Sequence, residues 1–248
     1  TAYEIPKRDW SSDVCSSDLA LTLDRKAFVE IMTAGTGGPG GAMQPLPEGR
    51  WGLPPEILNE LPGYGADVAK SREKARAAIV AKGYGPTKPL KLKVSTRNLP
   101  TYRDASVILI SQLKEIYIEA ELQLVETAQW VPKLIRRDYE VAVSQVGNGV
   151  DDPDQNYFEN YACGSRTYMD YCNKELDAMI AAQSAERDPE KRRKIAWEID
   201  RKLTNEAVRP MLYYMHGATC WQPGVKGIVI QVNSIYNNWR LEDVWIEQ

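Results

Sequence analysis

The chain has 248 residues, of which 43% are hydrophobic and 26% are charged, and its formal net charge is −3. This length suffices for one large α/β domain or two small ones, and the composition is ordinary for a globular protein. The near-neutral charge without a basic patch argues against a nucleic-acid partner, and no apolar run approaches the roughly 18 residues of a membrane span.

The start of the chain does not look like protein-coding sequence. Residues 8–19 read RDWSSDVCSSDL, without apolar periodicity and with two Ser-Ser-Asp repeats. The string resembles a translated sequencing adapter joined in frame to a gene; the alternative is a polar arm with a free thiol at Cys15. We expect residues 1–19 to be an artefactual or disordered leader. On this interpretation the natural protein begins near Ala20, and the lack of a signal peptide means only that the natural N-terminus is absent.

A helix is predicted over Leu21–Met32, where apolar residues recur at helical spacing: Leu23, Ala27, Phe28, Ile31 and Met32. The Gly-rich run that follows is expected to be a connector, since no strand precedes it and no Gly-Lys-Ser/Thr follows, as a phosphate-binding loop requires. Asp67 is the predicted cap of the next helix, Val68–Lys82, which stops at Gly83.

Strands and helices then alternate. Period-two patterns predict strands at Leu90–Ser95 and Glu121–Glu126, and a third strand is predicted at Tyr139–Val146, with helices at Tyr102–Ile116 and Gln129–Arg137 between them. This order predicts an α/β fold with a mainly parallel sheet flanked by helices. Ligands of such sheets bind beyond the carboxyl ends of the strands, so the loops at residues 96–101, 127–130 and 147–154 are candidates.

The last third is predicted to begin with two helices. The first covers Asn173–Glu186, and the second starts at Asp188-Pro189 and reaches Asn205, because Asp at the cap and Pro in the first turn favour a helix start. After Pro210 we expect extended chain, a turn at residues 222–224 and a tail.

Taken in this order, several stretches resemble the family 5 extracellular solute-binding proteins, which serve peptide- and nickel-type ABC importers. They are LTLDRKAFVEIM (21–32), the helix ending in Gly83-Tyr84, residues 102–125, GVDDPDQNYFENYACGS (149–165), YCNKELDAMI (171–180), HGATCWQPGVKGIV (216–229) and WRLEDVWIE (239–247). The resemblance covers Ala20 to Gln248, everything outside the adapter-like piece.

The resemblance implies the C-terminal lobe of a type II periplasmic-binding-protein fold about twice this length. Residues 20–212 would form the ligand-binding lobe, and residues 213–248 would return through the hinge to the other lobe. The implied function is capture of a peptide or other small solute and delivery to the membrane permease of an ABC importer. The implied location is periplasmic or extracytoplasmic, with lipid anchoring allowed, and we expect a monomer without cofactors.

The resemblance also places candidate ligand residues. Peptide-binding members carry an Asp in a Gly-Asp step after the third strand, where it pairs with the peptide's free amine; here the step is Gly147-Asn148. Because Asn offers no charge-assisted bond to an ammonium, either Asp151 or Asp152 replaces it, or the ligand is not a free peptide. The alternative is that these residues only build a tight turn.

Two further candidates follow the first and second strands. Arg97 could meet a carboxylate, although surface solvation is the simpler role, and Trp130 could stack on a ligand, although packing is simpler. Trp51 and Tyr102 are weaker candidates of the same kind as Trp130.

Cys163 and Cys172 form a disulfide in many family members, and the resemblance implies the same pair here. A metal site is the alternative, but His216 is the single histidine and no ligand cluster accompanies the cysteines. Cys220 is expected to be unpaired and buried. One histidine and no nucleophile elbow argue against a hydrolase, so we predict a non-enzyme. A chaperone-like peptide-holding module remains the alternative function.

Overall fold

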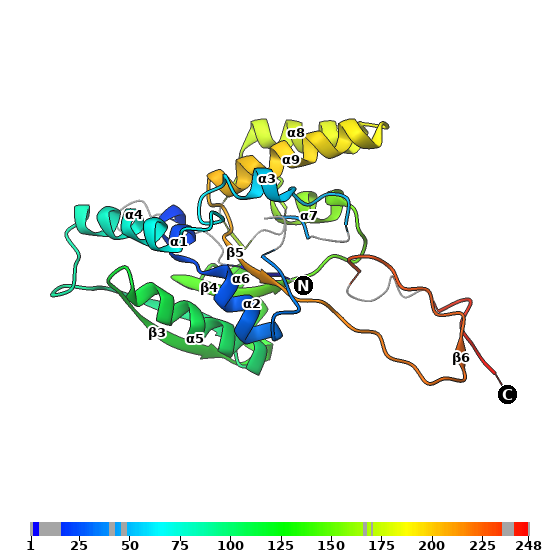
Figure 1. The fold of residues 1–248 in the computed structure, drawn as a ribbon, viewed down its shortest axis with the longest axis horizontal. Helices are drawn as coiled ribbons and strands as arrows, with labels where there is room; N and C mark the ends of the chain where they lie inside the picture. Colours follow the sequence, from blue (N-terminus) through cyan, green and yellow to red (C-terminus); the bar gives the residue numbers. More distant parts are fainter. Residues whose placement is uncertain are drawn as a thin grey trace.

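A computed structural model describes residues 2–4, 16–39, 43–45, 49–165, 168–169, 171–234 and 241–247. Its strands are β1 (Ala2–Glu4), β2 (Leu90–Arg97), β3 (Ile118–Val125), β4 (Val141–Val146), β5 (Met211–Tyr214), β6 (Val225–Lys226) and β7 (Trp245–Ile246). Its helices are α1 (Ser16–Thr22), α2 (Arg25–Thr33), α3 (Pro55–Leu58), α4 (Val68–Ala81), α5 (Pro100–Lys114), α6 (Thr127–Ile135), α7 (Pro153–Asn160), α8 (Lys174–Ala185) and α9 (Pro189–Asn205). Figure 1 shows the sheet in the body of the molecule and a long excursion of the chain near the C-terminus.

The described part of the chain contains a five-stranded sheet in the order β3-β2-β4-β1-β5. Its centre is parallel: in β2, Val94 pairs with Leu122 of β3 on one side and with Val141 of β4 on the other. This confirms the predicted α/β fold. The sequence did not indicate β1, which is antiparallel to both β4 and β5.

The two crossover helices cover opposite faces of the parallel strands. The chain moves from β2 to β3 on one side of β2 and then from β3 to β4 across it, so two right-handed crossovers place α5 and α6 on different faces. The α5 residues that face the sheet are buried at helical spacing: Tyr102, Ala105, Leu109 and Leu113. They pack with Leu92, Val94, Val141 and Val143 in the main core.

A second core lies under α7, α8 and α9, and Figure 1 shows α8 and α9 side by side above the sheet. The side chains of Asp152, Asn173 and Asp188 accept backbone N–H groups at the three helix starts, which satisfies donors that would otherwise have no partner. The predicted Asp188-Pro189 start is confirmed. The helix α7 was not predicted, because its sequence, PDQNYFEN, has little apolar periodicity.

The described part of the N-terminal region holds a strand and a helix that the sequence did not indicate. Residues 2–4 form β1, and α1 begins at Ser16 with Leu19 and Ala20 buried, while residues 8–15 lie outside the described part of the chain. The adapter origin of residues 8–19 stays a prediction. The predicted helix Leu21–Met32 is also divided, because Asp24 caps a separate helix, α2. Ile31, expected to face inward, is 66% exposed.

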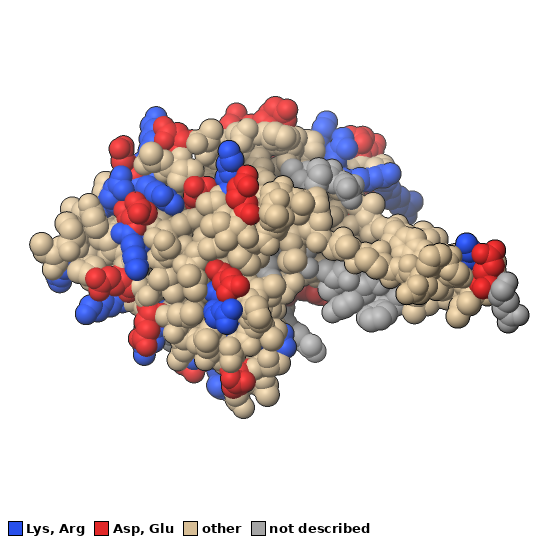
Figure 2. All heavy atoms as spheres, turned by 60° about the horizontal axis from the view of Figure 1, so that its bottom comes forward, with Lys and Arg blue, Asp and Glu red and all other residues tan. Residues whose placement is uncertain are grey.

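After β5 the chain leaves the body, and we call residues 215–247 the arm. Figure 1 shows it running outward to the short β6–β7 ladder, and Figure 2 shows a largely uncharged surface on it, whereas acidic and basic side chains alternate over the body. Its exposed large apolar residues are Trp221, Val229, Ile230, Val232, Leu241, Trp245 and Ile246. No helix in the described ranges has the length and hydropathy to cross a membrane.

Candidate ligand-binding site

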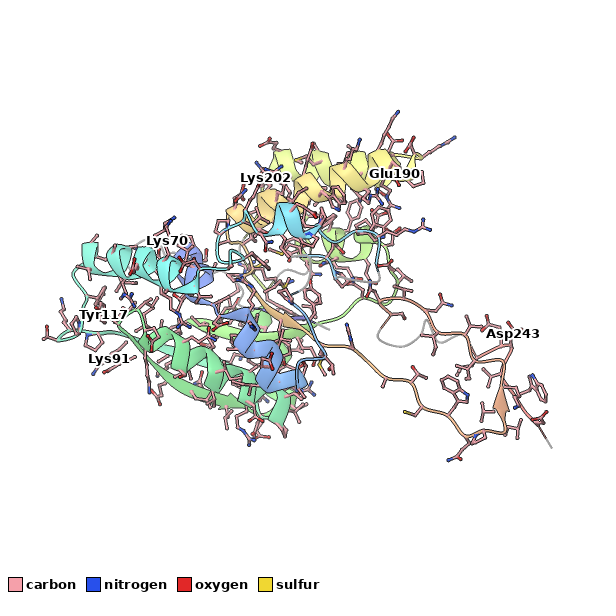
Figure 3. The ribbon with its side chains drawn as sticks, in the orientation of Figure 1. Lys70, Lys91, Tyr117, Glu190, Lys202 and Asp243 are labelled. Atoms are coloured by element: carbon pink, nitrogen blue, oxygen red, sulfur yellow. A yellow bond between two sulfur atoms is a disulfide. The ribbon has the colours of Figure 1, made fainter. Side chains whose placement is uncertain are left out.

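The carboxyl ends of the parallel strands meet at the edge of the sheet that faces the arm. Lys91 and Tyr117, at the starts of β2 and β3, are labelled at the opposite end of the molecule from Asp243 of the arm (Figure 3). The loops after β2, β3 and β4 therefore lie on the arm's side, where a ligand of this type of sheet is expected.

The loops after β2 and β3 are tied together. The Arg97 Nε donates to Thr127 Oγ1 at 3.1 Å, and its guanidinium lies 5.8 Å from the Tyr102 ring centroid. The adjacent Asn98 donates from Nδ2 to Glu126 Oε1 at 3.0 Å. Arg97 is partly exposed, so a carboxylate can still reach the guanidinium nitrogens that this single hydrogen bond leaves.

Trp130, on α6, is buried. It is 3% exposed and packs with Leu134, Tyr139 and Ala142. This burial supports the packing interpretation over stacking on a ligand. Tyr102 is likewise buried, in the main core.

The segment after β4, residues 147–152, is named here the ligand loop. Its backbone is fixed by Gln155 of α7, whose Oε1 accepts from Gly149 N at 2.7 Å and from Val150 N at 3.2 Å. Asn148 is partly exposed on this loop. The loop therefore presents Asn148 on a backbone held from the helix that follows.

Asp151 and Asp152 contact other parts of the protein. The Asp151 carbonyl accepts from Trp51 Nε1 at 2.9 Å, and its Oδ1 accepts from Asn233 Nδ2 at 3.0 Å. Asp152 caps α7 and receives two bonds from the Arg192 guanidinium, at 2.7 and 2.9 Å. The structural interpretation applies to Asp152, because a carboxylate that caps a helix and binds Arg in a bidentate pair has little acceptor capacity left for a ligand.

Arg192 joins this site to α9. It also approaches Asp154 at 3.3 Å, and its guanidinium lies 4.8 Å from the Trp51 ring centroid. Burial lowers the pKa of Arg192, but the carboxylates of Asp152 and Asp154 more than offset this, so the net pKa is raised. Sequence reasoning missed Arg192 and Asn233, because both are distant from the loop in sequence. It also missed Gln155, which lies in the quoted stretch 149–165, because its residue type does not indicate a bond back to the loop's N–H groups.

Cys163 and Cys172 form the predicted disulfide, with Cα atoms 4.6 Å apart, and the Cys163 N–H donates to Asp177 Oδ1 of α8. Cys220 is unpaired as expected, but the prediction of burial was wrong: it lies exposed on the arm. A search of the described residues finds no His, Cys, Asp or Glu group able to hold a metal ion. An open hollow of about 430 Å³ lies away from the strand-end loops, among charged side chains at the starts of β2 and β3.

Comparison with solved structures shows this fold in several proteins, each aligned over about half its own length. Haemophilus influenzae OppA in complex with the peptide RPPGFSPFR has a TM-score of 0.80 and 19% identity, covering 100% of this chain and 48% of that one. Bacillus subtilis AppA, an oligopeptide-binding protein in complex with a nonapeptide, has a TM-score of 0.75 and 19% identity, with coverages of 100% and 51%. Staphylococcus aureus NikA in complex with Ni(L-His)2 has a TM-score of 0.72 and 16% identity, with coverages of 94% and 49%.

A search of curated protein sequences returns no significant match. The family model described as bacterial extracellular solute-binding proteins, family 5 Middle, matches residues 19–168. That stretch is more than half of the chain, begins where the adapter-like string ends, and contains the three parallel strands with the loops that follow them. The chain belongs to the family 5 bacterial extracellular solute-binding proteins.

Proposed function

We propose that this chain is one lobe of the receptor of an ABC importer, which captures a peptide or peptide-like solute and delivers it to a membrane permease. The observation that carries the proposal is the shared edge of the sheet, where Arg97 and the ligand loop present polar groups beyond the parallel strands. Peptide complexes of OppA and AppA, which share this fold, support the solute class.

The second lobe would be supplied by sequence outside this chain. The chain spans about half the length of its solved relatives, and the arm, residues 215–247, exposes apolar side chains that a partner sheet would bury. We assign residues 20–212 to the ligand-binding lobe and residues 213–248 to the return toward the other lobe. A ligand that contacts both lobes favours the closed form, because it binds that form more tightly than the open one.

An extracytoplasmic location agrees with the disulfide, because such bonds persist in oxidising compartments. From family membership, we also propose that the receptor is a monomer, with or without a lipid anchor.

Within the site, we propose that Asn148 contacts the ligand's N-terminal group and Arg97 contacts a carboxylate. Asp151 would contribute its second carboxylate oxygen, since Oδ1 is bonded to Asn233. A neutral Asn148 suits an amide, a sugar or an opine at least as well as a free ammonium, because its hydrogen bonds are not charge-assisted.

The test uses the gene product extended to the length of its relatives, titrated calorimetrically with short peptides and with N-acetylated forms of the same peptides. We expect acetylated peptides to bind at least as tightly as free ones. Asn148→Asp should shift the ratio of affinities toward the free amine by about tenfold, or 1.4 kcal/mol, the gain from a charge-assisted bond. Asn205→Asp, at the exposed end of α9, is the matched charge control and should leave the ratio unchanged.

An unchanged ratio in Asn148→Asp would remove Asn148 from the site. Failure to bind any tested peptide, sugar or opine, combined with binding of unfolded polypeptide, would favour a chaperone-like module instead. Product formation during the titration would favour a hydrolase. The 248-residue chain alone should bind at least about tenfold more weakly than the extended protein, since it supplies one wall of the cleft.

A further inference from the structure

We propose that Asp151 couples the ligand loop to the arm, so that the conformation of the loop depends on the arm's position. This inference rests on the proposed function for its purpose, but its physical basis is a junction of three segments that are distant in sequence. The segments are the connector at residues 49–51, the ligand loop at residues 147–152 and the returning part of the arm at Asn233.

The three segments meet without spare room. A Cβ added to Gly49 would lie 2.2 Å from Asn233 Nδ2 and 2.8 Å from Asp151 Oδ1, the two atoms that share the 3.0 Å hydrogen bond. A side chain at position 49 would therefore displace one of these two side-chain atoms. The Asn233 backbone has a φ of 51°, a left-handed conformation in which Asn is enriched among non-glycine residues. The residue types at all three positions suit the junction.

The other side of the loop is held by the body. The Asp151 carbonyl accepts from Trp51 Nε1, and Trp51 lies against the Arg192 guanidinium, which also binds Asp152. Trp51 and Arg192 are thus positioning residues for the loop. Asp151 receives a bond from the body through its carbonyl and a bond from the arm through its carboxylate.

This arrangement lets the arm act on the loop. Figure 1 shows the arm extending from the body to the β6–β7 ladder, and Asn233, which follows β6 in the chain, is bonded back to Asp151 of the ligand loop. The Asp151–Asn233 bond stabilises the loop only while Asn233 is in its present place, so displacement of the arm removes that stabilisation. By linkage, ordering of the loop by a solute stabilises the arm's position by the same free energy. If the arm belongs to the other lobe, occupancy of the loop and lobe position are coupled through this bond.

The test is amide hydrogen exchange of this chain without ligand, followed by NMR or mass spectrometry at Gly149 and Val150, whose N–H groups are bonded to Gln155. Asn233→Gly keeps the left-handed backbone and removes the donor. It should speed exchange at these two amides by about tenfold, equivalent to about 1.4 kcal/mol, while amides of β2 and β4 keep their rates. Gly49→Ala should have the same effect, because its Cβ displaces the Asn233 side chain.

A conservative pair separates coupling from general damage. Asp151→Asn keeps an oxygen acceptor for Asn233 and should leave the exchange rates near those of the original chain, whereas Asp151→Ala should behave as Asn233→Gly does. Trp245→Ala, exposed at the tip of the arm, is the control and should change neither amide. Unchanged exchange in Asn233→Gly, or equal effects of Asp151→Asn and Asp151→Ala, would overturn the coupling. Because no ligand is present, neither result depends on whether the proposed function is correct.

Discussion

Asp200 of α9 should make the stability of this protein fall as the pH rises. The side chain is 0% exposed and accepts hydrogen bonds from Met43 N, Gln44 N and Thr204 Oγ1, at 2.9, 3.3 and 3.3 Å. Burial raises the pKa of Asp200 from 3.8 to about 8, although the three hydrogen bonds act in the opposite direction. The folded state therefore keeps a proton that the unfolded state releases.

The sign and size of the change in the free energy of unfolding with pH follow from this difference in pKa between the folded and unfolded states. The stabilisation is fully present below about pH 4 and is lost as the pH rises to about 8. Between these limits, one proton more in the folded state changes the free energy of unfolding by about −1.4 kcal/mol per pH unit. For a chain of this size, that slope corresponds to a decrease in Tm of about 3–5 °C per unit.

The assay compares this chain with Asp200→Asn by thermal or urea unfolding at pH 5, 6, 7, 8 and 9. The neutral amide imitates the protonated acid, so the free energy of unfolding of the variant minus that of the original chain should rise with pH and level off above about pH 8. Other titrating groups cancel in this difference. Asp104→Asn, an exposed aspartate on α5, is the matched control and should give a flat difference. A flat difference for Asp200→Asn would refute the reasoning.

Replacing both Cys163 and Cys172 by Ser should lower the free energy of unfolding by about 3 kcal/mol, the value for a loop of this length; urea denaturation with and without reductant measures it, and no loss would contradict the role. Trp130→Ala should lower the free energy of unfolding by about 3–5 kcal/mol, because the ring is buried among Leu134, Tyr139 and Ala142. A loss below about 1 kcal/mol would show that Trp130 is not a core residue. Arg97→Ala should change stability by less than about 0.5 kcal/mol but weaken solute binding by the extended protein; full affinity would exclude it from the site.

The sequence was sufficient to predict secondary structure where the local pattern of residues agrees with burial in the fold. Strands β2 and β3 follow from period-two alternation in the sequence, and burial alternates in the first half of β2, whereas the first four residues of β4 are all buried. The buried stripe of α5 follows from helical spacing. Helix starts were equally readable at Asp67 and Asp188, because a capping side chain and the N–H groups it accepts are close in sequence.

Features that depend on contacts between residues distant in sequence could not be predicted from the sequence. The strand β1 is three residues long, and its place between β4 and β5 is decided by pairing with Ser144–Val146 and with Met211–Tyr214. Ile31 is one of the apolar residues at helical spacing, but Phe28 and Val29 form the buried face of α2 and Ile31 lies outside it. In these cases tertiary pairing, which sequence periodicity does not report, determines the outcome.

The Asp-Asp-Pro-Asp run shows the same limit at the candidate site. Its residue types are those of a turn, a helix cap and a ligand contact alike, so composition alone left all three roles open. The structure separates them by partner: Asp152 caps α7 and binds Arg192, Asp154 meets Gln183 and Ser184 of α8, and Asp151 joins Trp51 to Asn233. Two of the three carboxylates thus attach α7 to α8 and α9.

Because of this division of roles, fewer groups are free to contact a ligand than the number of acidic residues in the run suggests. Because Asp152 and Asp154 both lie against Arg192, the groups left for a ligand on the proposed site are Asn148 and one oxygen of Asp151 on the ligand loop, and Arg97 at the end of β2. Charges already paired within the protein contribute little to a ligand's binding, since their hydrogen bonds would have to be exchanged rather than added. On the function proposed above, we therefore expect a solute with a neutral N-terminal group to bind at this edge of the sheet at least as tightly as one with a free ammonium.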